Sequence, residues 1–138
     1  MRFSTLQIDA ERQVRPLTLL DLDGLMQVQE ACYGAQYMES SVVYQGRIAE
    51  GAQCSLVAVQ GDTVLAYLAA YPSSLGKVTP LHGAFSAAQT PDTLYLHDMA
   101  VRPDCEGQGL ASALLNALWR HAQSWSPRYT ALVSVQGS

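Results

Sequence analysis

The sequence has few cysteines, and this shortage argues against disulfide-rich and zinc-binding proteins. Its 138 residues contain three, Cys32, Cys54 and Cys105, which is an odd number without a CxxC pair. Such a pattern argues against a disulfide framework and against a zinc site, and it is typical of reduced thiols in the cytosol. We therefore expect a cytoplasmic protein without a bound metal.

Long apolar runs and a basic excess are also absent. No apolar stretch approaches the roughly 20 residues that span a bilayer, and Met1 to Val14 lacks the apolar core of a signal peptide. The formal net charge is -4, whereas proteins that bind nucleic-acid phosphates present a basic surface. These shortages argue against a membrane or a nucleic acid as partner.

Apolar residues are plentiful, at 49% of the chain, and charged residues make up 14%. This balance allows a substantial core and argues against disorder. The length suits one domain, so we expect residues 1–138 to form a single α/β domain.

The first half of the chain predicts a strand, two helices and a hairpin. Residues 1–13 are a polar lead-in, and Val14 to Leu17 is expected to form a short edge strand because proline is tolerated at edges. Thr18-x-x-Asp21 resembles a capping box before a predicted helix. Apolar spacing predicts helices over 19–33 and 40–50. Turn residues predict a hairpin with strands over 54–59 and 63–71. Pro72 is expected to end the second strand, and a long loop is expected over 72–91.

The second half predicts a βαβ unit. Residues 93–101 form a strand, a glycine turn follows, and residues 109–125 form a helix with one apolar face. A last strand is predicted over 129–135. Two strands joined through a helix are parallel neighbours in a sheet.

The glycine turn is the most informative feature for function. A helix start leaves its first backbone N–H groups unpaired and carries a partial positive charge, so it favours an anion such as a phosphate. Gly107 and Gly109 remove side chains where the backbone would meet that anion. Glycine count alone leaves an ordinary tight turn equally open.

The longer segment from Leu96 to Leu115 resembles motif A of the GNAT family of N-acetyltransferases. Met99-Ala100-Val101, Pro103, Gly109, Ala111 and Leu114 match the motif's strand end, x-Pro, glycine turn and apolar helix. The stretch from Val14 to Tyr33 resembles the family's opening strand and helix. The resemblance implies a central mixed β-sheet with helices on both faces, and acetyl-coenzyme A (acetyl-CoA) as cofactor.

The resemblance also implies a set of site residues. The cofactor would contact Met99, Ala100, Val101, Glu106, Gly107, Gln108, Gly109, Leu110, Ala111 and Ser112. The N–H of Met99 would polarise the thioester carbonyl. Glu30, Tyr33 and Tyr37, near the end of the first helix, would border a small-molecule or peptide amine substrate.

A proton acceptor is expected on the strand over 93–101. Side chains alternate along a strand, so Tyr95, His97 and Met99 should share one face, and Leu96, Asp98 and Ala100 the other. The resemblance adds that some family members carry acids or histidines at the positions of Tyr95 and His97. His97 is the leading candidate for the catalytic base because imidazole titrates near neutral pH, and a structural role for it stays open.

Two departures from the family stand out. Glu106 occupies the position where the family has arginine or glutamine, and the chain stops at Ser138, before the family's last helix, whose tyrosine often protonates the departing thiolate. A short or truncated C-terminal part would invite a partner chain, so a homodimer is a further expectation.

Three other functions are compatible with a glycine-rich turn in part. A dinucleotide-binding oxidoreductase needs an acidic residue about 20 positions after the glycines, and none follows Glu106. A P-loop is excluded because its Gly-Lys-Ser/Thr signature is missing. A non-catalytic acyl-CoA sensor or interaction module remains the alternative to an enzyme.

Overall fold

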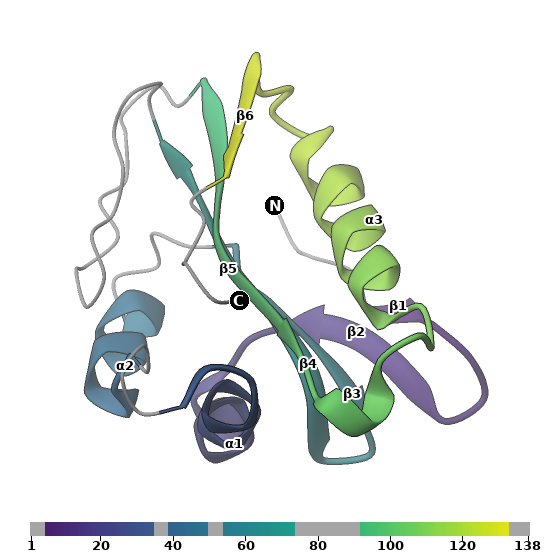
Figure 1. Cartoon of the computed structure of the whole chain (residues 1–138). Coiled ribbons are helices and arrows are strands. Elements are labelled where there is room, and N and C mark those ends of the chain that lie inside the picture. Colours follow the sequence, from purple (N-terminus) through teal and green to yellow (C-terminus); the bar gives the residue numbers. More distant parts are fainter. Residues whose placement is uncertain (1–4, 35–38, 50–53, 74–91, 133–138) are drawn as a thin grey trace.

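The computed structural model describes residues 5–34, 39–49, 54–73 and 92–132, and in these ranges a single mixed sheet organises the chain (Figure 1). Neighbouring strands are antiparallel from the first to the fifth, and the fifth and sixth are parallel. In spatial order the strands are β1 (Leu6–Gln7), β2 (Arg12–Pro16), β3 (Leu56–Gln60), β4 (Thr63–Ser73), β5 (Thr93–Val101) and β6 (Tyr129–Leu132). The expected mixed sheet and the parallel βαβ unit are confirmed.

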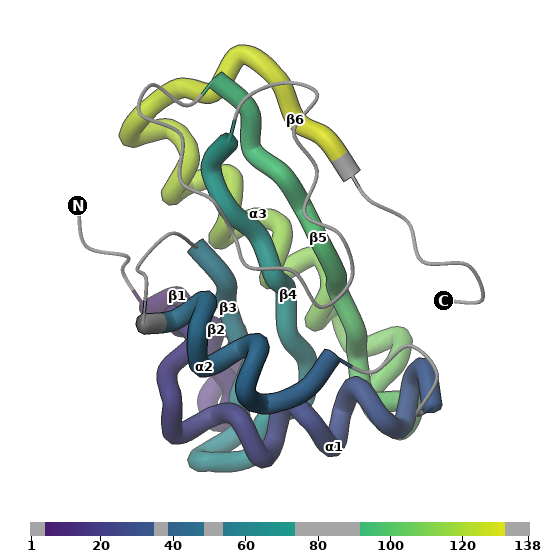
Figure 2. Tube along the Cα trace, turned by 90° about the vertical axis from the view of Figure 1, so that its left-hand side faces the viewer, coloured from purple at the N-terminus to yellow at the C-terminus, as the bar shows by residue number. Residues whose placement is uncertain are grey.

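Helices cover both faces of the sheet. Helices α1 (Leu22–Tyr33) and α2 (Ser41–Ala49) lie on one face, and α3 (Leu110–Ala122) lies on the other (Figure 1). Figure 2 shows the same layers from the side, with α1 and α2 in front of the strands and α3 behind them. Short 3-10 turns, η1 (Leu19–Asp21) and η3 (Pro103–Cys105), precede α1 and α3. None of the described helices has the length and apolar character needed to cross a bilayer.

Each face of the sheet has its own apolar core. Leu22, Leu25 and Val28 of α1 pack with Tyr67 and Tyr95 of the sheet. On the other face, buried residues of α3 recur every three or four positions and pack on the opposite sides of the same strands: Leu110, Leu114, Ala117, Leu118 and Ala122. Burial of one such leucine contributes about 1.5–3 kcal/mol, so the amphipathic pattern fixes which face of α3 meets the sheet.

The N-terminal region is more ordered than its sequence predicts. β1 lies in the segment expected to be an unassigned lead-in, so β2 is flanked on both sides and is not an edge strand. The capping interaction before α1 is present, because the N–H of Thr18 donates to Asp21 Oδ2 at 2.9 Å. Arg15 adds two hydrogen bonds of 2.8 Å to the same carboxylate.

Pro72 does not end its strand, contrary to expectation. It lies within β4, opposite Leu94 of β5. The next residue, Ser73, accepts a hydrogen bond from Asp92 on the β5 side, so the nitrogen of Pro72 faces the other side. There β3 pairs with β4 only as far as Leu68, and proline is tolerated in a strand where no ladder hydrogen bond is needed.

Candidate functional site

The two parallel strands pair over only part of their length. β6 pairs with residues Thr93 to Leu96 of β5, and the described part of β6 offers no partner to residues 97–101. The carbonyls of Met99 and Val101 point to this open edge, where they accept hydrogen bonds from Tyr33 Oη at 2.9 Å and Cys32 Sγ at 3.1 Å. A strand residue directs its N–H and C=O to the same edge, so the N–H groups of Met99 and Val101 also face it.

The glycine turn adopts a conformation that requires glycine. Gly107 has φ +76° and Gly109 has φ +81°, a region that other residues rarely occupy. A Cβ at either position would meet no protein atom within 4 Å, so the turn faces open space. Gln108 is turned to the other side, where its Oε1 accepts a hydrogen bond of 2.6 Å from Arg12 of β2.

The start of α3 supplies backbone donors. Its first hydrogen bond runs from the N–H of Ala113 to the carbonyl of Gly109, at 3.0 Å. The N–H groups of Leu110, Ala111 and Ser112 have no hydrogen-bond partner among residues 5–34, 39–49, 54–73 and 92–132. The positive end of the helix therefore presents three donors that an anion could accept.

A cavity of about 600 Å³ joins the open strand edge to the glycine turn. Its lining includes most of the predicted cofactor contacts, namely Met99, Ala100, Val101, Glu106, Gly107, Gly109, Leu110, Ala111 and Ser112. Gln108 is the predicted contact that is missing from it. Ala31, Cys32 and Tyr33 of α1 also line it, and Pro103 and Cys105 of η3 complete the lining. The backbone donors at the start of α3 could hold an anionic group, and those at the open strand edge could hold an amide-bearing arm.

A β-bulge changes the predicted alternation on β5. Ala69 of β4 is opposite Asp98 whereas Ala70 is opposite Leu96, so His97 is an extra residue in the pairing. His97 and Asp98 therefore both contact residues on the α1 and α2 side. Met99 packs instead with the α3-side core. The prediction that His97 and Met99 share one face, with Asp98 on the other, is wrong for this reason.

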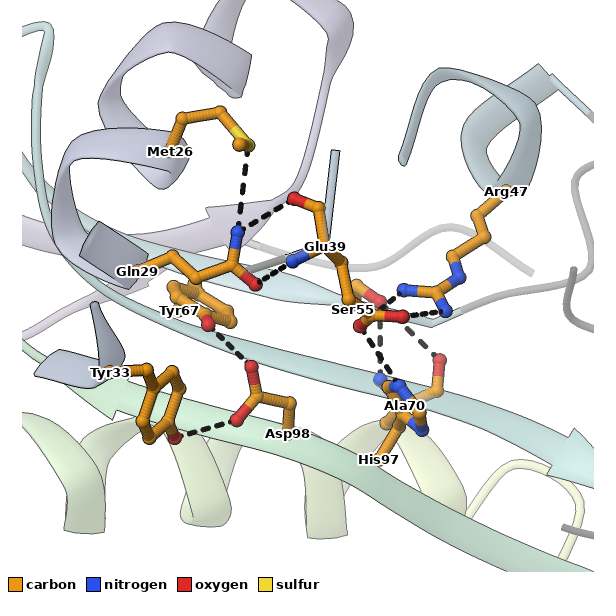
Figure 3. A network of polar contacts seen from close by, with 10 residues as sticks. All are labelled: Met26, Gln29, Tyr33, Glu39, Arg47, Ser55, Tyr67, Ala70, His97 and Asp98. Atoms are coloured by element: carbon orange, nitrogen blue, oxygen red, sulfur yellow. Dashed lines mark hydrogen bonds and ion pairs between the residues drawn. The ribbon is translucent and has the colours of Figure 1, made fainter. Parts of the chain in front are cut away.

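Asp98 is the centre of a phenol cluster behind the open edge (Figure 3). Its Oδ1 accepts a hydrogen bond of 2.7 Å from Tyr33, and its Oδ2 accepts a short one from Tyr67. Burial raises the pKa of Asp98, and the two phenol donors oppose that rise only in part. Burial and the hydrogen bond to Asp98 raise the pKa of Tyr33, so this phenol stays protonated near neutral pH.

A second polar cluster connects both helices of that face with β5 (Figure 3). The Glu39 carboxylate binds Arg47 at 3.0 and 2.6 Å and His97 Nε2 at 3.0 Å. Its backbone exchanges hydrogen bonds with the side chain of Gln29 in α1. Burial would raise the pKa of Glu39, but the hydrogen bonds from His97 and Arg47 outweigh it and lower the pKa to about 2.

The predicted catalytic and substrate residues are not all at the cavity. Tyr33 lines it, Glu30 is exposed on α1, and Tyr37 lies outside the described residues. Tyr95 is buried and stacks on Tyr71 with ring centroids 5.5 Å apart. His97 is 4% exposed and is absent from the lining.

Sequence reasoning missed Glu39, Arg47 and Tyr67, since their partners are 8 to 58 positions away and no local pattern marks them. Within the described ranges, no three His, Cys, Asp or Glu side chains gather in a way that could hold a metal ion.

Comparison with models of protein families gives one match. A model of the acetyltransferase (GNAT) family matches residues 22–136. No curated protein matches the chain.

Many solved structures share the fold. An aminoglycoside acetyltransferase from an uncultured soil metagenomic sample, solved with sisomicin, gives a TM-score of 0.68 at 17% identity over 94% of this chain and 82% of its own. A GNAT family acetyltransferase from Brucella melitensis, solved with acetyl-CoA, gives 0.66 at 22% identity over 94% and 79%. A ribosomal-protein-alanine N-acetyltransferase from Brucella melitensis biovar Abortus 2308 gives 0.65 at 17% identity over 91% and 81%. At these identities the likeness is one of fold.

Proposed function

Because this chain belongs to the acetyltransferase (GNAT) family, we propose that it is an N-acetyltransferase that transfers an acetyl group directly from acetyl-CoA to a primary amine. Family membership and the structural neighbour solved with acetyl-CoA support this co-substrate. When bound, acetyl-CoA supplies an acetyl group that is already activated as a thioester. The protein then has to bind acetyl-CoA, to polarise its thioester carbonyl and to transfer the proton that the amine loses.

The observation that carries the proposal is the cavity that unites two sets of backbone donors. The N–H groups of Leu110, Ala111 and Ser112 would hold the diphosphate. The N–H groups of Met99 and Val101 would hold the pantetheine arm at the open edge, where both carbonyls already accept hydrogen bonds from α1. The N–H of Met99 would polarise the thioester carbonyl, a contribution of about 2.7–4 kcal/mol for one such donor in acyl transfer.

Glu106 lines the same cavity but is exposed to solvent. Repulsion between unit charges about 4 Å apart in water is about 1 kcal/mol. Main-chain donors at the start of α3 would offset a cost of this size, so Glu106 is compatible with the proposal.

His97 has a positioning role in this scheme. An ionised carboxylate only accepts hydrogen bonds, so Nε2 of His97 donates to Glu39. Through Arg47, which binds the same carboxylate, the buried pair holds β5 against α2, next to the bulge that sets the direction of Asp98. Tyr95 supports the same strand by stacking on Tyr71. Tyr33 borders the amine from the cavity wall, and Glu30 and Tyr37 remain candidate contacts for the rest of the acceptor.

Calorimetric titration with acetyl-CoA, followed by an amine panel, tests the proposal. The panel contains sisomicin, spermidine, lysine and a peptide that begins with alanine. Product is followed by the mass of the acetylated amine, since the three cysteines of the chain would react with a thiol reagent. Binding together with an acetylated product is the expected result. Binding of acetyl-CoA without product across the panel favours an acyl-CoA sensor. If acetyl-CoA does not bind, both the N-acetyltransferase and the sensor are contradicted.

A further inference from the structure

The Tyr33–Asp98 pair links the cavity to the buried phenol cluster. Resting on the proposed acetyl transfer, we propose that Tyr33 is a catalytic residue that relays a proton between the substrate and Asp98. Tyr33 takes the proton of the acceptor amine while it passes its own to Asp98, and it later returns a proton to the departing sulfur. The pair would thus act as base and then as acid within one turnover.

Among the described phenols of this face, position distinguishes Tyr33. Tyr33 lines the cavity, whereas Tyr67 and Tyr44 are each 1% exposed and are absent from its lining. Its hydroxyl lies 2.9 Å from the carbonyl of Met99, the residue whose N–H would polarise the thioester. Asp98 itself does not line the cavity. A proton from the cavity therefore reaches the carboxylate through Tyr33.

The hydrogen bonds of Tyr33 suit both protonation states of Asp98. The Tyr33 hydroxyl lies within 2.7 Å of Asp98 Oδ1 and 2.9 Å of Met99 O, and it has one hydrogen. When Asp98 is ionised, Tyr33 donates to Asp98. When Asp98 is protonated, Asp98 donates to Tyr33, which then donates to Met99. The hydrogen bond between Tyr33 and Asp98 is therefore kept in both protonation states, whereas leaving a buried polar group unpaired would cost about 1–3 kcal/mol.

The pKa values of Asp98 and Tyr33 are consistent with these two roles, Asp98 as the base and Tyr33 as the relay. A carboxyl group with a raised pKa is a stronger base than an ordinary aspartate. A phenol with a raised pKa does not ionise by itself, so it transmits a proton only as another arrives. Within the described ranges, the titratable groups that interact with Asp98 are Cys32 and Tyr33 from α1, Tyr44 from α2, Glu39 before α2, Tyr67 from β4 and the adjacent His97 from β5. Arg47 from α2 is the charged group bound to Glu39.

The atoms and charges of the step balance without a further reactant. The amine nitrogen forms its bond to the acetyl carbon, and the carbon–sulfur bond breaks with its electron pair on sulfur. Tyr33 accepts the proton lost by nitrogen as Asp98 accepts the proton of Tyr33. Asp98 then returns a proton to Tyr33, which protonates the sulfur, and both side chains regain their starting states.

Tyr33→Phe is the direct test, and Tyr67→Phe is its matched control. Both variants remove one phenol hydroxyl from the same carboxylate, but only Tyr33 lines the cavity. Measured with the most active amine of the panel, Tyr33→Phe should lower kcat by about 100-fold or more, the size of a general acid–base contribution. Its acetyl-CoA affinity by calorimetry should stay within about threefold of the wild type. Tyr67→Phe should lose less than about tenfold in kcat.

The pH profile distinguishes a relay from a structural contact. The hydrogen bond from Tyr67 favours the ionised form of Asp98, so Tyr67→Phe should move the acidic limb of kcat/KM to higher pH. This result is available even if Tyr33→Phe does not fold. Asp98→Asn should lower kcat as Tyr33→Phe does, and the double variant should be no slower than the slower single variant, since the two residues act as a unit.

The outcomes separate the relay from the proposed function. A folded Tyr33→Phe variant with kcat within threefold of the wild type overturns the relay and leaves acetyl transfer standing. An acidic limb that Tyr67→Phe does not move overturns it as well. A wild-type chain that binds no acetyl-CoA, or that acetylates no amine of the panel, overturns the proposed function and the relay together.

Discussion

Two requirements meet at Gly109: a positive φ angle, and free space in front of the backbone for a bound group. Its φ of +81° costs a residue with a side chain about 1–2 kcal/mol, and the space in front of it belongs to the cavity. The same backbone demand, without the cavity, occurs at Gly61 in the turn between β3 and β4, where φ is +59° and an added Cβ would also meet no protein atom. The two glycines therefore form a matched pair.

We expect Gly109→Trp and Gly61→Trp to lower the free energy of unfolding by similar amounts, about 1–2 kcal/mol. Gly109→Trp alone should weaken acetyl-CoA binding, by at least about tenfold or 1.4 kcal/mol, because the indole would occupy the phosphate position. Urea unfolding and calorimetric titration of both variants provide the measurements. Equal acetyl-CoA affinity in the two variants would contradict the assignment of the phosphate to this turn.

At the scale of elements, Glu39 and its partners Gln29, Arg47 and His97, here called the Glu39 cluster, link α1, α2 and β5. The pKa of Glu39 is lowered from 4.5 to about 2 by His97 and Arg47. A carboxylate whose pKa is lower in the folded than in the unfolded state stabilises the fold above the unfolded value, and this stabilisation is lost as the pH falls toward the folded value. The relevant window therefore runs from about pH 5 down to about pH 2.

We expect the free energy of unfolding to fall as the pH is lowered through that window. The contribution of Glu39 is on the order of 3 kcal/mol, and urea titrations at a series of pH values measure the fall. Glu39→Gln should be less stable than the wild type at pH 7 and should show a flatter acid limb. Glu30→Gln, on the exposed face of α1, is the control, and an acid limb that Glu39→Gln leaves unchanged would count against the cluster.

Local sequence patterns predicted the elements well and their polar connections poorly. The span of β5 follows from a strand-like run that stops before Pro103, and the apolar face of α3 follows from a 3.6-residue period after the glycine turn. Both are properties of the segment itself. The bulge at His97 depends on how β4 pairs with β5, and nothing within residues 93–101 marks it. The pairing of Glu39 with Arg47 and His97 likewise exists only after α2 has packed on the sheet.

The same distinction between local patterns and long-range contacts applies to the candidate site. The residues of the glycine turn were predicted because one short segment supplies both the bend and the donors. Tyr33 was predicted as a substrate contact, but its hydrogen bonds to Asp98 and Met99 join residues 65 and 66 positions apart. A pattern of such long range is invisible in a single sequence, so Asp98 could not be placed beside the cavity in advance.

At the scale of the whole molecule, close packing between layers sets how near α1 lies to the sheet. A Cβ added at Gly24 of α1 would be 2.7 Å from Cγ2 of Val64 and 2.9 Å from its Cβ, on β4. Val64 is buried and β-branched, so it has little freedom to move away. Gly46 of α2 offers the contrast, because a Cβ there would meet no atom within 4 Å.

Gly24→Ala and Gly46→Ala should consequently have opposite effects. Alanine in place of glycine inside a helix normally stabilises by about 0.5–1 kcal/mol, and we expect this gain for Gly46→Ala. Gly24→Ala should instead lower the free energy of unfolding by about 1–3 kcal/mol, the usual cost of overpacking. Thermal and urea unfolding of both variants give the comparison, and a stabilised Gly24→Ala variant would show that α1 can move away from β4.

The spatial order of the strands, from β1 to β6, repeats their order along the chain. Within the described part of the chain, each strand is therefore added beside the one synthesised just before it, and none of these six strands has to be inserted between two that have already paired. A nascent chain emerging from the ribosome could extend this sheet from one side only, with each new strand meeting a ready template.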